Sequence, residues 1–169
     1  ISGGGSALWS LPAPPLTLDD LQATTTALLA SGLPIDRVNT VRRHLSAIAG
    51  GRLAAAAHPA TVAALVISDV PGDDPAVVAG GPTVADPTTF ADALEALEAG
   101  GILQTVPPAV RGHLEAGRRG EVVDTPATLA GSNRTTLVGA NGDALAAAAQ
   151  AARDLGWPTR VVADPVEGE

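Results

Sequence analysis

The first residues that could do chemistry form a glycine run near the amino terminus. Ser2-Gly3-Gly4-Gly5-Ser6 leaves backbone N–H groups able to converge on a phosphate or carboxylate without obstruction from side chains. The run is not a Walker A loop, because no Gly-Lys-Ser/Thr follows it. A flexible linker is the alternative, although the three residues that follow, Ala7-Leu8-Trp9, are too apolar for one.

A second candidate anion site lies on a helix expected to begin near Pro34. Asn39, Arg42, Arg43 and Ser46 are spaced i, i+3, i+4 and i+7, so their side chains project from one face of that helix. Two guanidinium groups beside an amide and a hydroxyl can hold a phosphate or a carboxylate. A solvated basic face is the alternative.

The centre of the chain places carboxylates after a buried strand. Val62 to Ser68 is a short apolar run rich in β-branched residues, which predicts a strand. Asp69 follows at the carboxyl end, where open parallel sheets bind ligands, and Asp73 lies in the Pro-Gly turn beyond it. Mg²⁺ takes one or two carboxylates together with waters and phosphates, so Asp69 and Asp73 could hold it. The alternative is a solvated turn in which Asp73 caps a helix that begins near Pro75.

Helices and strands alternate around these residues. Amphipathic helices are expected over residues 18–30, 34–50, 52–57, 75 onwards, 89–99, 107–116 and 144–155, and strands over 62–68, 135–139 and 159–163. Thr17, with Asp20 three residues later, predicts a capping box. The spacing of the last strand, helix and strand indicates a right-handed parallel crossover. We therefore predict an α/β fold: a three-layer α/β/α, Rossmann-like domain with a mainly parallel sheet.

Helical periodicity also predicts which side chains are buried. The residues expected on the apolar face of the first long helix are Leu18, Leu21, Thr25, Leu28 and Leu29. The alanine-rich helix near the carboxyl end is expected to pack closely against a neighbour. His113 has no obvious partner in the sequence and is expected at the surface.

Composition excludes several classes of protein. A chain of 169 residues is long enough for one domain with a full core. All ten basic residues are arginine, and the net charge of −8 argues against nucleic acid as a partner. The absence of cysteine excludes disulfides and thiolate metal sites. No apolar run approaches the roughly 20 residues that span a membrane, and no signal-peptide pattern is present, so we expect a cytoplasmic protein with no membrane partner.

Four stretches together resemble the class II glycerate kinases, also called the glycerate 2-kinase or MOFRL family. They are ISGGGSAL from Ile1, NTVRRHLSAIAGGRLA from Asn39, ISDVPGDDPAVVAGGPTVADPTTF from Ile67 and the GAN turn from Gly139. The resemblance covers essentially all 169 residues but only the middle of the family's chain. It implies two α/β domains with the active site in the cleft between them. On this basis residues 1–169 are expected to be a single α/β domain, a fragment of the N-terminal domain of a longer two-domain protein.

The resemblance implies transfer of the γ-phosphoryl group of ATP to a hydroxyl of D-glycerate, with Mg²⁺, giving 2-phosphoglycerate. This reaction depends on positioning and charge neutralisation, which suits the glycine run, the arginines and the acidic strand end. The residues implied as catalytic are Arg42, Arg43 and Asp69, and the metal ligands are Asp69 and Asp73. The residues implied to bind substrate or phosphate are Ser2, Gly3, Gly4, Gly5, Ser6, Asn39, Ser46, Gly81, Pro82, Thr83 and Asn141. ATP and D-glycerate are the implied partners, with a homodimer as a candidate assembly.

One departure from the family keeps other functions open. The family usually has lysine just before the paired glycines, where this chain has Ala49, whereas Arg43 keeps the charge at a position where lysine is also common. Ala49 favours a non-catalytic nucleotide- or acid-binding domain. The family's amino-terminal segment and carboxy-terminal domain are also missing from residues 1–169, and a cleft without one wall cannot orient both substrates, so we expect these residues alone to be inactive. A hydroxypyruvate reductase-type oxidoreductase is the other alternative. It is disfavoured because no G-x-G-x-x-G is followed by an acidic residue about 20 positions later.

Overall fold

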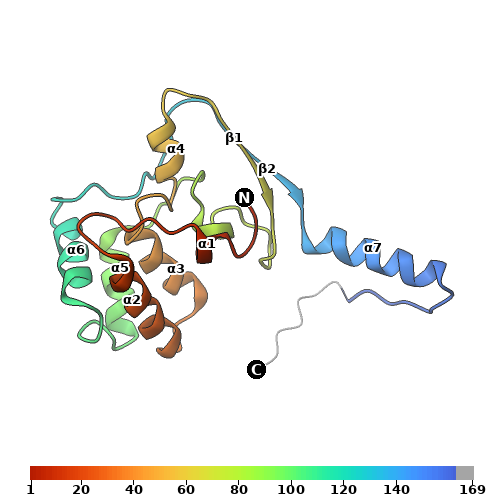
Figure 1. Ribbon diagram of the computed structural model, residues 1–169, viewed down its shortest axis with the longest axis horizontal. Helices are drawn as coiled ribbons and strands as arrows, with labels where there is room; N and C mark the ends of the chain where they lie inside the picture. The colour runs from red at the N-terminus through yellow and green to blue at the C-terminus, as the bar shows by residue number, and fades with distance from the viewer. Residues whose placement is uncertain (163–169) are drawn as a thin grey trace.

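The computed structural model describes residues 1–162, in which a body of packed helices carries a two-stranded ribbon and a projecting helix (Figure 1). The helices are α1 (Gly5–Leu8), α2 (Leu18–Ala30), α3 (Ile35–His44), α4 (Arg52–Ala57), the short 3₁₀ helix η1 (Val78–Gly80), α5 (Phe90–Ala99), α6 (Pro108–Arg118) and α7 (Asn141–Asp154). The strands are β1 (Val62–Ile67) and β2 (Asn133–Gly139).

The two strands run parallel, as the sequence predicts. Val62 lies opposite Asn133 and Ile67 opposite Gly139, with a shift of register just before Ile67. The amino terminus extends this ribbon, because Ser2 forms a parallel bridge with Ile67. The chain between the strands passes through α5 and α6, so helices separate two parallel strands and the α/β class is confirmed.

The hydrophobic core lies among α2, α3, α5 and α6. Local sequence determines where two of these helices begin. The N-terminal caps of α2 and α5 are capping boxes, in which Thr17 pairs with Asp20 and Thr89 with Asp92. The buried apolar residues are Leu16, Leu28, Val38, Val41, Leu45, Phe90, Ala93, Leu94, Ala96, Leu97, Val106, Val110 and Leu114. Four helices and the loops between them thus form one continuous core.

Several local predictions are wrong. The helix that begins near Pro34 ends at His44 and not at Gly50, because Ser46 pairs with Pro12 as a bridge in place of a further helical turn. No helix begins at Pro75, where turns lead into η1. Residues 159–162 form no strand, and Ala163, the last residue of that predicted strand, lies outside the described residues. A strand needs a neighbour to pair with, and this segment follows α7 away from the ribbon (Figure 1).

The predicted apolar face of α2 is correct in part, and the predicted position of His113 is wrong. Leu28 is buried and Leu21 packs against the core, as predicted. Leu18 and Leu29 are instead 51% and 69% exposed, and Thr24 is buried. His113 is buried, because Phe90 of α5 and the backbone of α3 lie over it. Both errors concern contacts between helices that are distant in the sequence.

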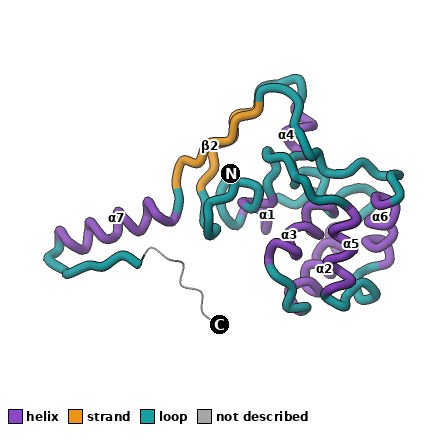
Figure 2. The backbone as a smooth tube through the Cα atoms, turned by 180° about the vertical axis from the view of Figure 1, so that it is seen from behind, coloured by secondary structure: helices purple, strands orange, loops and turns teal. Residues whose placement is uncertain are grey.

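The ribbon and α7 extend away from the helical body (Figure 2). Leu65 and Ile67 of β1 are more than half exposed, and Ala149 is the buried residue that the structure describes within α7. The close packing expected for this alanine-rich helix is therefore not formed within residues 1–162. No helix in the described part of the chain is long and apolar enough to cross a membrane.

Candidate functional site

A pocket of about 570 Å³ opens on the helical body between α2, α3 and η1. Its lining residues are Trp9, Ser10, Leu18, Leu21, Gln22, Thr25, Thr26, Asn39, Arg42, Arg43, Leu45, Ser46, Ile48, Ala49, Ala79, Gly80 and Pro82. The set includes all four polar side chains that the helical spacing places on one face of α3: Asn39, Arg42, Arg43 and Ser46. The fold thus brings this predicted set together in a concave site.

The opposite wall comes from α2, and sequence reasoning missed it. Leu18, Leu21 and Thr25, together with Gln22 and Thr26, face the pocket. Their i, i+3, i+4, i+7, i+8 spacing is also the spacing of a core-facing stripe. The available signal was the interruption of this stripe by Gln22, Thr25 and Thr26, since a core stripe is normally apolar throughout.

Within the pocket, Arg43 is held by a buried carboxylate. Its Nε lies 3.0 Å from Asp86 Oδ2, and the two side chains are only 12% and 3% exposed. Thr88 fixes that carboxylate, because its hydroxyl donates to Asp86 Oδ1 at 2.7 Å and its backbone N–H donates to the same atom at 3.1 Å. The charge of Arg43 is therefore largely balanced within the protein, and its position is fixed.

A third arginine shapes the loop that follows α3. Arg52 Nη1 donates to the carbonyl oxygens of Arg43 at 2.9 Å and Ser46 at 3.1 Å. Burial lowers the pKa of Arg52 from its ordinary value, while the charges of Asp124 and Asp86 oppose that shift. The Ser46 hydroxyl in turn accepts the backbone N–H of Ala49 at 3.1 Å. These contacts present Ala49, which stands at the family's usual lysine position, to the pocket.

The rim of the pocket is formed where two pairs of glycines meet. The Gly50 N–H donates to the Gly80 carbonyl at 2.9 Å, and the Gly51 N–H donates to the Gly81 carbonyl at 2.8 Å. All four glycines have φ between 58° and 78°, a region that other residues rarely adopt. Next to Gly81, Pro82 lines the pocket. The next residue, Thr83, is buried and does not line the pocket.

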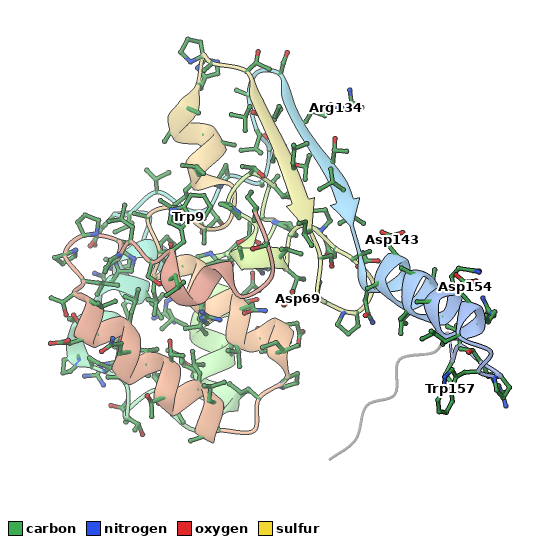
Figure 3. The ribbon with its side chains drawn as sticks, turned by 45° about the vertical axis from the view of Figure 1, so that its right-hand side comes forward. Trp9, Asp69, Arg134, Asp143, Asp154 and Trp157 are labelled. Atoms are coloured by element: carbon green, nitrogen blue, oxygen red, sulfur yellow. The ribbon has the colours of Figure 1, made fainter. Side chains whose placement is uncertain are left out.

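The remaining predicted residues gather elsewhere, at the carboxyl ends of the strands. The Asp69 carboxylate lies so close to Gly3 that a Cβ on Gly3 would overlap it. The Gly3 N–H donates to the Ile67 carbonyl at 3.2 Å, which brings the glycine run to the end of β1. Asn141 begins α7 directly beyond the end of β2. Figure 3 shows Asp69 just past the arrowhead of β1, on the side of the helical body.

The two groups of residues are connected through α1 and η1. A Cβ on Gly5, at the start of α1, would lie 3.1 Å from the Cβ of Ala79, which lines the pocket. Trp9, just after α1, lines the pocket as well. The glycine run therefore leads from the strand ends to the mouth of the pocket. Of Ser6 only the backbone, within α1, is described.

Two carboxylates lie at the end of β1 and in the turn that follows it. Asp69 is exposed at the end of β1, and Asp73 is half-buried in the following turn with a φ of 54°. Within residues 1–162, no three side chains from His, Asp and Glu come together in a way that could hold a metal ion. Mg²⁺ needs only one or two carboxylates when waters and phosphates complete its octahedron, so these donors fit a metal that arrives with phosphate.

The chain has clear relatives among known proteins. Residues 1–115 match the family model described as "Domain of unknown function (DUF4147)". Over all 169 residues the chain is 49% identical to a putative hydroxypyruvate reductase of Agrobacterium vitis and 44% identical to glycerate 2-kinase of Pyrococcus horikoshii. It spans 37% and 38% of the length of these two proteins, and 42% of a glycerate kinase from Macaca fascicularis.

Two solved structures share the fold. A protein from Pyrococcus horikoshii OT3 superposes with a TM-score of 0.80 at 46% identity, over 92% of this chain and 36% of that one. A glycerate kinase from Thermotoga maritima superposes with a TM-score of 0.77 at 39% identity, over 92% and 35%. With the family model covering most of its length and glycerate kinases among its relatives in sequence and structure, the chain belongs to the DUF4147 family, the class II glycerate kinases that its four motifs resemble.

Proposed function

We propose that this chain provides the phosphate- and acid-binding part of an ATP-dependent glycerate 2-kinase. In this reaction a hydroxyl oxygen of D-glycerate forms a bond to the γ-phosphorus of ATP, the bond from that phosphorus to the β,γ-bridging oxygen breaks, and ADP, 2-phosphoglycerate and a proton result. The observation that carries the proposal is the convergence of Asn39, Arg42, Arg43 and Ser46 on one pocket. The similarity to proteins named glycerate kinase supports it.

Some side chains of the pocket are suited to bind an anion, and others hold the pocket wall in position. Arg42 and Asn39 line the pocket and can donate hydrogen bonds to a phosphate or carboxylate. Arg43 holds the wall of the pocket in place through Asp86. Asp69 lies next to the glycine run, and its carboxylate, exposed at the strand end, can meet a metal ion that arrives with phosphate. Ala49 leaves the pocket without the family's usual lysine, so arginine supplies its positive charge.

Magnesium fits this arrangement at the strand end. Asp69 would hold the ion, with Asp73 as the second carboxylate, and bound Mg²⁺ neutralises negative charge on the transferring phosphates. Gly3 must stay without a side chain for the Asp69 carboxylate to keep its place beside the glycine run.

An assay of the full-length protein separates this proposal from its main competitor. The competitor is a reductase acting on hydroxypyruvate, because one relative carries that name. We expect ADP release that depends on D-glycerate and Mg²⁺, and no oxidation of NADH or NADPH by hydroxypyruvate. Reductase turnover without ADP formation would reverse the assignment. Binding of ATP or D-glycerate without either turnover would instead indicate a non-catalytic binding protein.

A further inference from the structure

We propose that the α2 side of the pocket binds the purine base of the nucleotide, with Trp9 as the stacking surface. This inference rests on the proposed kinase function and assigns a part of the ligand to a wall of the pocket. It concerns residues that neither the motifs nor the family resemblance single out, namely Trp9, Leu18, Leu21 and Gln22.

The size of the pocket suits a ligand larger than the acceptor acid. Its volume of about 570 Å³ falls within the range of about 300–1,000 Å³ that is typical for drug-sized ligands and cofactors. A three-carbon acid would leave most of this volume to water. A nucleoside attached to phosphates is of the appropriate size and is already required by the proposed reaction.

The walls of the pocket differ in chemistry in the way that a nucleotide requires. The α2 wall presents the apolar side chains of Leu18 and Leu21, and Ile48 adds a third from the loop after α3. The α3 wall presents Arg42 and Asn39. A base can be buried against the first wall while phosphates meet the second, and a small acid cannot satisfy both.

Trp9 and Gln22 give the apolar wall its selectivity. Trp9 lines the pocket and is 44% exposed, so a ligand can reach its aromatic ring. Stacking of a base on such a ring is favourable for every base. The Gln22 amide lies in the same wall and offers the donor and acceptor pair that amides use to read the edge of adenine.

The charge of the pocket favours an anionic ligand although the chain as a whole is acidic. The net charge of the sequence is −8, yet none of the described residues that line the pocket is an aspartate or a glutamate. Two of them are arginines, and of these Arg43 is already paired with Asp86. The positive charge of Arg42, with no carboxylate among the described lining residues, therefore favours an anionic ligand such as a nucleotide.

Adenosine tests the base subsite without any transfer chemistry. The chain has two tryptophans, so Trp157→Phe leaves Trp9 as the only fluorophore of its kind. In this background we expect adenosine and ATP to change the Trp9 emission in a saturable way, and ribose 5-phosphate and inorganic tripolyphosphate to leave it unchanged. A response to tripolyphosphate equal to that of ATP, or none to adenosine, would overturn the proposal.

Two variants locate the site, with calorimetry as the readout. Trp9→Ala is expected to weaken adenosine binding about 5- to 150-fold, the loss that corresponds to removing one stacked base. Thr25→Phe should abolish it by filling the pocket, and Leu29→Ala serves as the control, because Leu29 is on the same helix but points away. Unchanged binding to the folded Trp9→Ala protein would refute the assignment. Adenosine binding in a full-length protein that lacks kinase turnover would uphold the subsite while refuting the proposed function.

Discussion

Asp69 is the side chain on which the proposed chemistry depends most directly. We expect Asp69→Asn to reduce the turnover of the full-length protein about a hundredfold or more, the size of loss seen when one group that stabilises transition-state charge is removed. Excess Mg²⁺ should recover part of the loss, because asparagine binds the ion more weakly than the carboxylate does. The measurement is ADP release over a range of Mg²⁺ concentrations.

Asp74→Asn is the matched control for this prediction. Asp74 lies in the same turn, and its Oδ1 accepts the Ala76 N–H at 2.9 Å, a contact that an asparagine oxygen can keep. Its turnover should stay close to that of the wild type. An Asp69→Asn protein with normal turnover and an unchanged Mg²⁺ requirement would show that the carboxylate is structural.

Ala49 offers a test of charge in the pocket. Because Ala49 lines the pocket, Ala49→Lys adds an ammonium near Arg42 and should tighten the binding of tripolyphosphate about two- to fivefold, the size expected for one partly solvated ion pair. The gain should diminish as salt is added. Ala56→Lys on the exposed side of α4 adds the same charge at another place. Equal effects of the two lysines in calorimetry would show that net charge alone matters.

His113 makes the stability of the fold sensitive to acid. Burial lowers the pKa of His113 below its ordinary value of 6.5, and the nearby charges of Arg52 and His44 lower it further, against a hydrogen bond to the His44 carbonyl. Its Nε2 donates to that carbonyl at 3.1 Å, while its buried Nδ1 has no hydrogen-bond partner among the described residues. A proton on Nδ1 would therefore be unpaired.

The direction of the pH effect follows from this shift. The folded state favours neutral His113, so the unfolded chain binds more protons, and stability is lost as the pH falls below about 6.5. We expect His113→Gln, which can still donate to the carbonyl, to lose less stability between about pH 7.5 and pH 5 in urea unfolding. His58→Gln at the surface is the control. Parallel pH profiles for wild type and His113→Gln would contradict the assignment.

At the scale of elements, the contact between α5 and α6 depends on one residue without a side chain. A Cβ on Gly117 would overlap the ring of Phe90, which is 1% exposed in the core. Gly117→Ala should destabilise the protein by about 1–3 kcal/mol, as overpacking does. Gly112→Ala lies on the same helix with open space around it and should be neutral or stabilise by up to about 1 kcal/mol. Chemical denaturation of both variants checks the contrast, and a similar effect of both would contradict it.

The sequence predicts the parts of these elements that are determined locally. The cap at Thr17 follows from Asp20 three positions later, and β1 follows from a short apolar run. Contacts between residues that are distant in the sequence could not be predicted in this way. Asp86 holds Arg43 from 43 positions away, and its choice of partner has no signature in either segment.

The helix α2 shows a second limit of the same kind. Its apolar residues satisfy the pattern of a buried face, but a pocket that binds an apolar group needs the same pattern. Only the packing of α2 against α3 and α6 decides that Leu28 faces the core and Leu18 the pocket. The spacing of the α3 residues in the sequence was enough to predict their part of the site. The α2 wall could be identified only from the three-dimensional structure.

At the scale of the whole molecule, the helical body and the projecting helix should be independent in stability. Within residues 1–162, α7 buries little beyond Ala149 and packs extensively on no other helix or strand. Deleting residues 141–169 should therefore leave the unfolding midpoint of the body unchanged, as followed by circular dichroism. Leu28→Ala should lower it, costing about 2–5 kcal/mol, which shows that the measurement reports on the core. A lower midpoint for the truncated chain would mean that α7 stabilises the body.

The meeting of Gly50–Gly51 with Gly80–Gly81 has a consequence for how this family can diversify. These two hydrogen bonds use only main-chain atoms, so the side chain at the neighbouring position 49 takes no part in them. We expect a substitution at position 49 to alter ligand preference without disturbing these backbone contacts. The replacement of a customary lysine by Ala49 is one such exchange, and a designer could repeat it with other residues to redirect specificity.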